Sequence, residues 1–163
     1  MKKLNLRDLN LSQNDIDKFV NSSIDVEPDS ILFIDNENVE KLDTHVNDAL
    51  TKNAKKILTS EKCNISNEKI LKVSNYEEVL NQAYSFICPD YDKKTYFGIT
   101  GTNGKTTTGY YLEQILGNNT IFIGTNNEDL FSDITKEKHL TSPKLFNILK
   151  FLSKPKNKTY ENI

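Results

Sequence analysis

The chain has 163 residues, of which 36% are hydrophobic and 27% charged, and its 21 basic and 23 acidic side chains give a net charge of −2. This length suits one ordinary globular domain or two small ones. The balanced charge argues against nucleic acid and anionic membranes as partners, because both usually require a basic excess. The two cysteines are too few for a disulfide framework, and no signal peptide or membrane span is visible. The protein is therefore expected in the cytoplasm.

Alternating strands and helices are predicted over residues 1–92. In chain order they are a short helix from Ser12 through Val20, a buried strand at 30–34, an amphipathic helix at 41–53, strands at 55–60 and 69–74, and a helix capped by Asn75. The apolar face of the last helix consists of Val79, Leu80, Ala83 and Ile87. The segment 88–94 begins with Cys-Pro and continues with charged residues, which predicts a linker and a domain boundary after residue 92.

The second part continues the same alternation. It contains a predicted strand at 95–100, a helix at 105–116 ended by Gly117, a strand at 120–124, a polar loop at 125–139 and a helix that starts at Ser142 and Pro143. Strands alternating with helices predict an α/β fold with parallel sheets. The expected organisation is a small N-terminal α/β domain at 1–92, followed by the start of a P-loop central domain at 93–163.

The turn at 101–108, Gly-Thr-Asn-Gly-Lys-Thr-Thr-Thr, carries the main chemical signal. Its two glycines let successive backbone N–H groups face phosphate oxygens, and the following helix turns its positive end to the same point. Lys105 supplies a charge for the β- and γ-phosphates, and the Thr106 hydroxyl is placed to bind Mg²⁺. The predicted ATP-binding residues are Gly101, Thr102, Asn103, Gly104, Lys105, Thr106 and Thr107, with Lys105 and Thr106 also as the catalytic pair.

This loop departs from the strict pattern G-x-x-x-x-G-K-[ST], which would put a glycine where Ile99 stands. One alternative is therefore a glycine-rich turn that binds nothing. The complete strand–loop–helix context favours nucleotide binding. A GTPase or a P-loop kinase is disfavoured by Asn103, by the N-terminal domain and by the lack of a guanine-specifying Asn-Lys-x-Asp.

The sequence GTNGKTTT resembles the phosphate loop of the Mur ligases, above all those that add the third residue to UDP-N-acetylmuramoyl-dipeptide. Three flanking segments strengthen the resemblance. Residues 23–33 are similar to the family's uridine-site segment, residues 121–125 to its Ile-Gly-Thr, and residues 141–143 to the Thr-Thr-Pro that holds the peptide stem of the precursor. The resemblance covers nearly the whole chain.

The resemblance implies substrate-binding roles for Ser22, Ser23, Thr141 and Ser142. The family's Asp-Ser-Arg is Ser22-Ser23-Ile24 here, and Asp29 stands in place of a glycine. For Ser22 and Ser23, a polar turn before a strand remains the alternative to a uracil contact. Ser142 would cap its helix whether or not it also touches the precursor.

The resemblance also implies the reaction, that of a monomeric ligase dependent on ATP and Mg²⁺. A substrate carboxylate attacks the γ-phosphate of ATP, and the amino group of an incoming amino acid displaces phosphate from the resulting acyl phosphate. The expected substrates are UDP-N-acetylmuramoyl-L-Ala-D-Glu and the amino acid. Other ligases of the superfamily, of the folylpolyglutamate or cyanophycin type, and a non-catalytic nucleotide-binding fragment remain alternatives. Because Mur ligases have three domains, the chain is expected to be an incomplete and inactive N-terminal part.

Overall fold

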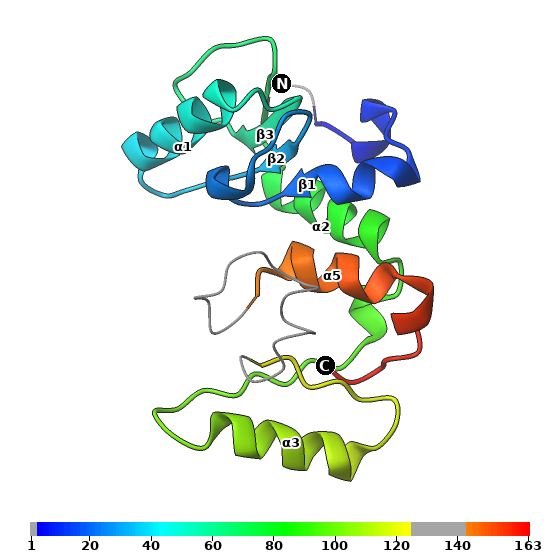
Figure 1. The fold of residues 1–163 in the computed structure, drawn as a ribbon. Coiled ribbons are helices and arrows are strands. Elements are labelled where there is room, and N and C mark those ends of the chain that lie inside the picture. Colours follow the sequence, from blue (N-terminus) through cyan, green and yellow to red (C-terminus); the bar gives the residue numbers. More distant parts are fainter. Residues whose placement is uncertain (1–2, 125–142) are drawn as a thin grey trace. The chain divides into compact units, whose positions relative to one another are not determined.

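A computed structural model describes residues 3–124 and 143–163 of the chain. These residues form two compact units, Met1–Phe86 and Ile87–Ile163. The division falls at the end of helix α2 (Tyr76–Ile87), six residues before the predicted boundary, and Figure 1 labels most of the helices and strands of each unit. The roles expected for the two domains remain proposals.

The first unit is built on a parallel sheet with the strand order β1-β2-β3-β4. The strands are β1 (Phe19–Val20), β2 (Ile31–Phe33), β3 (Lys56–Ser60) and β4 (Ile70–Val73). Helix α1 (Val39–Thr51) connects β2 to β3, as a crossover between parallel strands requires. The predicted strands at 30–34, 55–60 and 69–74 and the predicted helix at 41–53 are confirmed, as is the α/β fold class.

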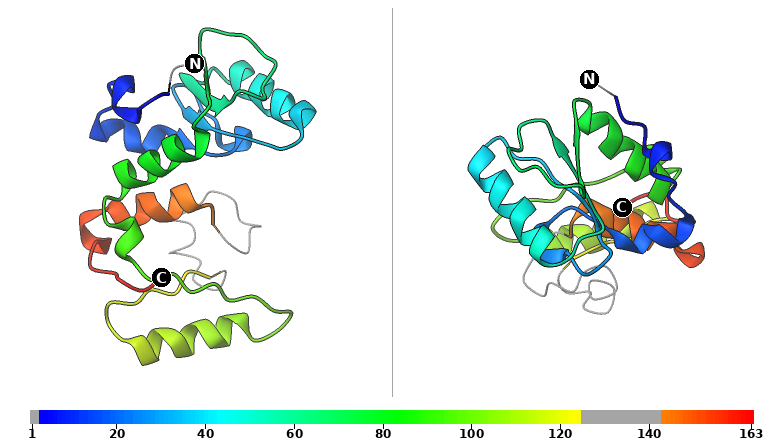
Figure 2. Two further views of the ribbon diagram at one scale, coloured as in Figure 1. Left: turned by 180° about the vertical axis from the view of Figure 1, so that it is seen from behind. Right: turned by 90° about the horizontal axis from the view of Figure 1, so that it is seen from above.

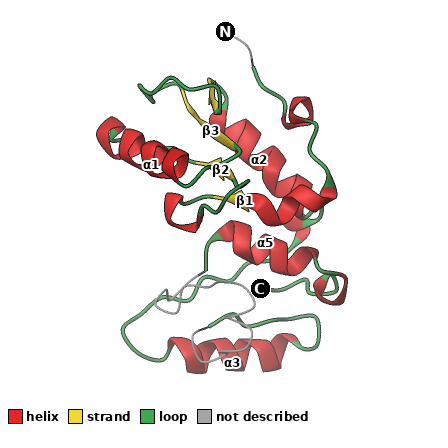
Figure 3. Ribbon diagram, turned by 45° about the horizontal axis from the view of Figure 1, so that its top comes forward, coloured by secondary structure: helices red, strands yellow, loops and turns green. Residues whose placement is uncertain are grey.

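Helices α1 and α2 lie on opposite faces of this sheet, as Figures 2 and 3 show. On the α1 face, Leu32 and Ile57 form a core with Leu42, Val46 and Ala49 of the helix, and all five are fully buried. The alternating side chains of each strand make this possible, because neighbouring residues point to opposite faces.

Aromatic rings fill the other face. The Phe19 ring lies 5.2 Å from the Phe33 ring and 5.9 Å from the Phe86 ring of α2. Val79 and Ala83, predicted as core positions of this helix, are buried. The unit therefore has three layers, with α1, the sheet and α2 in that order.

One local prediction in this unit is wrong. The helix that starts at Ser12 does not reach Val20, because a 3₁₀ helix occupies Gln13–Lys18 and Phe19 then enters strand β1, pairing with Ile31. Asn75 precedes α2 as predicted, and its carbonyl accepts from Val79 N–H at 3.1 Å; its side chain also holds the N-terminal segment, since Oδ1 accepts from Leu4 N–H at 3.4 Å and Nδ2 donates to Leu4 O at 3.2 Å. At Phe19, strand pairing overrides the local helical signal.

The second unit contains α3 (Lys105–Leu116) and α5 (Leu145–Ser153). The predicted strands at 95–100 and 120–124 are wrong as regular strands, since each makes a single parallel bridge to Asn162. Thr95 N–H donates to Glu161 O at 2.8 Å, and Ile121 N–H donates to Asn162 O at 2.9 Å. Residues 161–163 thus lie between the two segments, and the pairing is too short to count as a ladder.

Helix α5 supplies the core of the second unit through Phe146, Leu149 and Leu152, which are fully buried. It begins at Leu145 with Lys144 in the N-cap position, later than predicted; Ser142 lies outside the described residues. The predicted end of α3 is confirmed, because Gly117 follows it with φ 84°. No helix in the described ranges has the length and apolar character that a membrane crossing needs.

Candidate nucleotide site

The turn before α3 has the backbone geometry that a phosphate-binding loop needs. Gly101 has φ 146° and Gly104 φ 79°, both in the region that side chains strongly disfavour. Gly104 is the N-cap of α3, and its carbonyl accepts from Thr108 N–H at 2.9 Å. The first-turn N–H groups of this 12-residue helix lack partners within the helix and point toward its N-terminus, where the loop lies.

Lys105 folds back across this loop. Its Nζ donates to the carbonyl oxygen of Gly101 at 2.5 Å, so the ammonium lies over the turn that the two glycines create. The side chain is half-buried. An anion in the loop would meet this positive charge together with the helix N-terminus, since Lys105 is itself the first residue of α3.

A cavity of about 290 Å³ opens beside the loop. Lys105 and Thr106 line it together, whereas Thr102, Asn103 and Thr107 are exposed and are absent from its lining. The other walls are segments 96–99 and 122–124 with Pro143, Ile148 and Ile163. Its volume lies just below the range of small-molecule pockets, about 300–1,000 Å³, and suits part of a nucleotide rather than all of one. The two residues predicted to be catalytic thus share one cavity.

The serines predicted to contact the precursor are engaged inside the first unit. Ser23 is buried, and its Oγ lies 3.1 Å from Nδ1 of His45 on α1. Its carbonyl accepts from Lys52 Nζ at 2.7 Å. Ser22 Oγ accepts from Ile24 N–H at 3.3 Å and so begins the 3₁₀ turn at Ser23–Asp25. Thr141 and Ser142 lie outside the described residues.

Sequence reasoning missed a hollow of about 470 Å³ at the carboxyl ends of the parallel strands. Asp35 and Lys62 line it, with 3.9 Å between Asp35 Oδ2 and Lys62 Nζ, and Ser60 Oγ donates to Asp35 Oδ1 at 2.5 Å. Burial, together with the nearby Asp35 carboxylate, raises the pKa of Tyr76, which also lines the hollow. The signal was available, because polar residues follow each strand and ligands of open α/β sheets bind at this edge.

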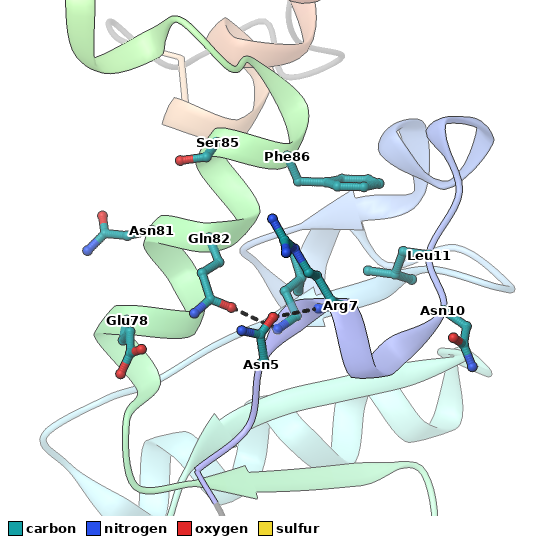
Figure 4. Close-up of a pocket in the computed structure, with 10 residues that line it drawn as sticks. Asn5, Arg7, Asn10, Leu11, Glu78, Asn81, Gln82, Ser85 and Phe86 are labelled. Carbon is teal, nitrogen blue, oxygen red and sulfur yellow. Dashed lines mark hydrogen bonds between the residues drawn. The ribbon is translucent and has the colours of Figure 1, made fainter.

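A further hollow, about 1,170 Å³, lies between the N-terminal segment and α2 (Figure 4). Four of its ten lining residues are asparagine or glutamine, and Arg7 points between Gln82 and Phe86. Gln82 Oε1 also accepts from Leu6 N–H at 2.7 Å, which holds the segment on the helix. Sequence reasoning did not anticipate this hollow, because residues 4–11 show no periodicity that predicts it.

Comparison with known proteins finds a family that matches the part of the chain containing this loop. Residues 99–163, which include the loop and α3, match the family description Mur ligase middle domain. The chain belongs to the Mur ligase family. The part that matches therefore starts at the segment leading into the loop and contains both residues that share the cavity.

Curated relatives of this Mur ligase chain carry the name UDP-N-acetylmuramoyl-L-alanyl-D-glutamate–2,6-diaminopimelate ligase. The one from Rickettsia prowazekii (strain Madrid E) is 30% identical over 130 residues, covering 77% of this chain and 27% of that protein. The one from Rickettsia bellii (strain RML369-C) is 36% identical over 87 residues, covering 52% and 18%. The chain thus spans about a quarter of the length of the relatives it matches.

Among solved structures, the MurF ligase from Thermotoga maritima in complex with ADP matches with a TM-score of 0.39 and 24% identity. The match covers 60% of this chain and 22% of that one.

Proposed function

We propose that this chain carries the phosphate-binding loop of an ATP-dependent amide ligase that adds the third amino acid to UDP-N-acetylmuramoyl-L-Ala-D-Glu. The observation that carries the proposal is the joint position of Lys105 and Thr106 at one cavity, directly after the two positive-φ glycines of a loop in the Mur ligase middle domain. The relatives' name supplies the precursor, and it names 2,6-diaminopimelate as the incoming amino acid of those proteins.

The proposed work of the loop is electrostatic. Backbone N–H groups from Gly101 to Gly104 and the N-terminus of α3 hold the phosphates, with Thr102, Asn103 and Thr107 contributing from the exposed side. Lys105 moves from the Gly101 carbonyl to the phosphate oxygens and offsets their charge as the phosphoryl group passes to the precursor's carboxylate. The amino acid's nitrogen then displaces phosphate, so one amide forms and ADP and phosphate leave.

The residues fit a magnesium ion as well as a phosphate. Thr106 is half-buried at the cavity that Lys105 shares, where a hydroxyl ligand to Mg²⁺ beside a bound triphosphate is required. The ion would neutralise charge on the β- and γ-phosphates. Thr106 would hold it by one oxygen, and phosphate oxygens and water would complete its shell.

The first unit is the proposed binding site of the UDP-linked precursor. The strand-end hollow beside Asp35 and Lys62 supports this role through its position and polarity. Because Ser22 and Ser23 bond within the protein, we assign them the task of shaping the turn before β2. A monomer acting in the cytoplasm completes the proposal.

Calorimetric titration of the purified chain tests the two halves separately. Titration with ATP and Mg²⁺ should give binding that Lys105→Met weakens, and titration with UDP-N-acetylmuramoyl-L-Ala-D-Glu should give binding that is independent of this change. Nucleotide binding without precursor binding, in a chain shown to be folded by circular dichroism, would favour a folylpolyglutamate- or cyanophycin-type ligase. No binding of ATP would contradict the proposal at its centre.

A further inference from the structure

The ring of Phe122 occupies a notch made by two glycines. A Cβ added at Gly109 would lie 2.2 Å from Phe122 Cε2, and one added at Gly124 would lie 2.5 Å from Cζ. Real Cβ atoms do not approach other atoms so closely, so both positions accept only glycine while the ring stays where it is. The Tyr110 ring meets the same side chain edge-on, with 5.2 Å between the centroids.

The backbone around Phe122 is also fastened to α3. Phe122 N–H donates to Glu113 Oε1 at 3.1 Å, one helical turn beyond Gly109. Thr120 N–H donates to the carbonyl of Gly117 at 3.0 Å, just past the helix end. Segment 120–122 is therefore held along the length of α3, with the phenylalanine ring at the end nearest the loop.

The packing of Phe122 against Gly109 and Gly124 also shapes the cavity beside the phosphate loop. Phe122 and Gly124 line the same cavity as Lys105 and Thr106. Gly109 lies in the first half of α3, one turn after Lys105, and is buried although a helix interior normally favours alanine there. The distance between α3 and segment 120–124 is thus set by the Phe122 ring, which packs directly on the backbone of Gly109.

We propose that Phe122 is a positioning residue for the phosphate loop: seated between Gly109 and Gly124, its ring fixes the spacing at which Lys105 and Thr106 face the nucleotide cavity. This inference rests on the proposed function, because the nucleotide is its ligand. It adds that the affinity of the loop depends on a contact that touches no phosphate. Any side chain at residue 109 displaces the N-terminal half of α3, and the loop moves with it.

The test is Gly109→Ala, with Gln114→Ala as the matched control on an exposed position of the same helix. Because a displaced loop weakens the charge-assisted bond of Lys105 to phosphate, Gly109→Ala should weaken ATP binding with Mg²⁺ by about tenfold. The control should bind within about twofold of the unchanged chain, since its side chain faces solvent. Affinity is measured well below the thermal midpoint of each variant.

Rescue separates positioning from general packing. Leucine is smaller than phenylalanine, so Gly109→Ala combined with Phe122→Leu should recover most of the affinity that Gly109→Ala loses. Phe122→Leu alone should weaken ATP binding, because the smaller leucine would not fill the space between Gly109 and Gly124. A drop in thermal midpoint with unchanged ATP affinity in both single variants would overturn the inference and leave Phe122 as ordinary core.

A measurement without nucleotide keeps the inference separate from the proposed function. Amide hydrogen exchange at Thr108, whose N–H is bonded to Gly104, and at Phe122 reports directly on the anchoring of the loop helix. Gly109→Ala should accelerate exchange at both amides and Gln114→Ala at neither. If the unchanged chain fails to bind ATP, the proposed function fails, and exchange rates still decide whether Phe122 positions α3. Equal exchange in Gly109→Ala and the unchanged chain would refute the inference.

Discussion

Replacing Lys105 by methionine tests the nucleotide site most directly. Methionine keeps much of the length and apolar character of the lysine stem but removes the charge, so the cavity wall is preserved. Without nucleotide, the loss is one hydrogen bond from Nζ to the Gly101 carbonyl in an exposed loop, which should change the free energy of unfolding by less than about 1 kcal/mol. With nucleotide, the loss is a charge-assisted bond to phosphate, about 1.5–3 kcal/mol.

That difference converts to a dissociation constant for ATP that is about 10- to 150-fold higher in Lys105→Met, at an almost unchanged thermal midpoint. Isothermal titration with ATP and Mg²⁺ measures the first quantity and calorimetric melting the second. Lys154→Met is the control, because Lys154 is exposed after α5, in the same unit, and does not line the cavity. Equal weakening in both variants would refute the site and leave only a general charge effect.

Three further outcomes follow from individual contacts. Thr106→Val should leave ATP binding without Mg²⁺ nearly unchanged and reduce the gain on adding Mg²⁺, as titrations with and without the ion would show. The Ser12 backbone N–H, and after it Lys18, lower the pKa of Asp15, so the contribution of Asp15 to folding stability is complete above the unfolded pKa of 3.8 and is lost as pH falls below it. Asp15→Asn should therefore lower the free energy of unfolding by about 1 kcal/mol at pH 7 and by progressively less in acid, as denaturant melts would show. Leu58→Ala, fully buried in β3, should cost about 2–5 kcal/mol in the same melts.

The sequence predicted the fold best for helices and strands that bury one face with regularly spaced apolar residues. The 3.6-residue spacing of Leu42 and Val46 predicted α1, and the apolar run at 30–34 predicted β2, because both patterns reflect burial against the sheet. Phe19 was misread because its spacing also fits a helix; what decides its state is pairing with Ile31, which no local pattern records.

At the candidate site, residues that are contiguous in the sequence could be predicted, and residues brought together by the fold could not. The loop at 101–104 was predicted because glycines, lysine and helix start follow one another in the chain. The cavity wall at Phe122 and the strand-end hollow at Asp35 join residues that are far apart in sequence, so the motif could not reveal them. The role of Ser23 was left open between a turn and a uracil contact, and His45, 22 residues away, supplies the partner that favours the turn.

The position of the bound precursor can be tested by comparing substitutions at two residues of the first unit, Lys62 and Ser23. If the strand-end hollow binds the UDP-linked precursor, Lys62→Met should weaken its binding about fivefold, the equivalent of about 1 kcal/mol for a half-exposed charge. Lys41→Met, an exposed lysine on α1 outside the hollow, is the control. Ser23→Ala should lower the free energy of unfolding, because His45 loses its partner, and leave precursor affinity unchanged. If Ser23→Ala instead abolishes binding at unchanged stability, its hydroxyl leaves His45 to contact the precursor, and the site lies at the turn before β2.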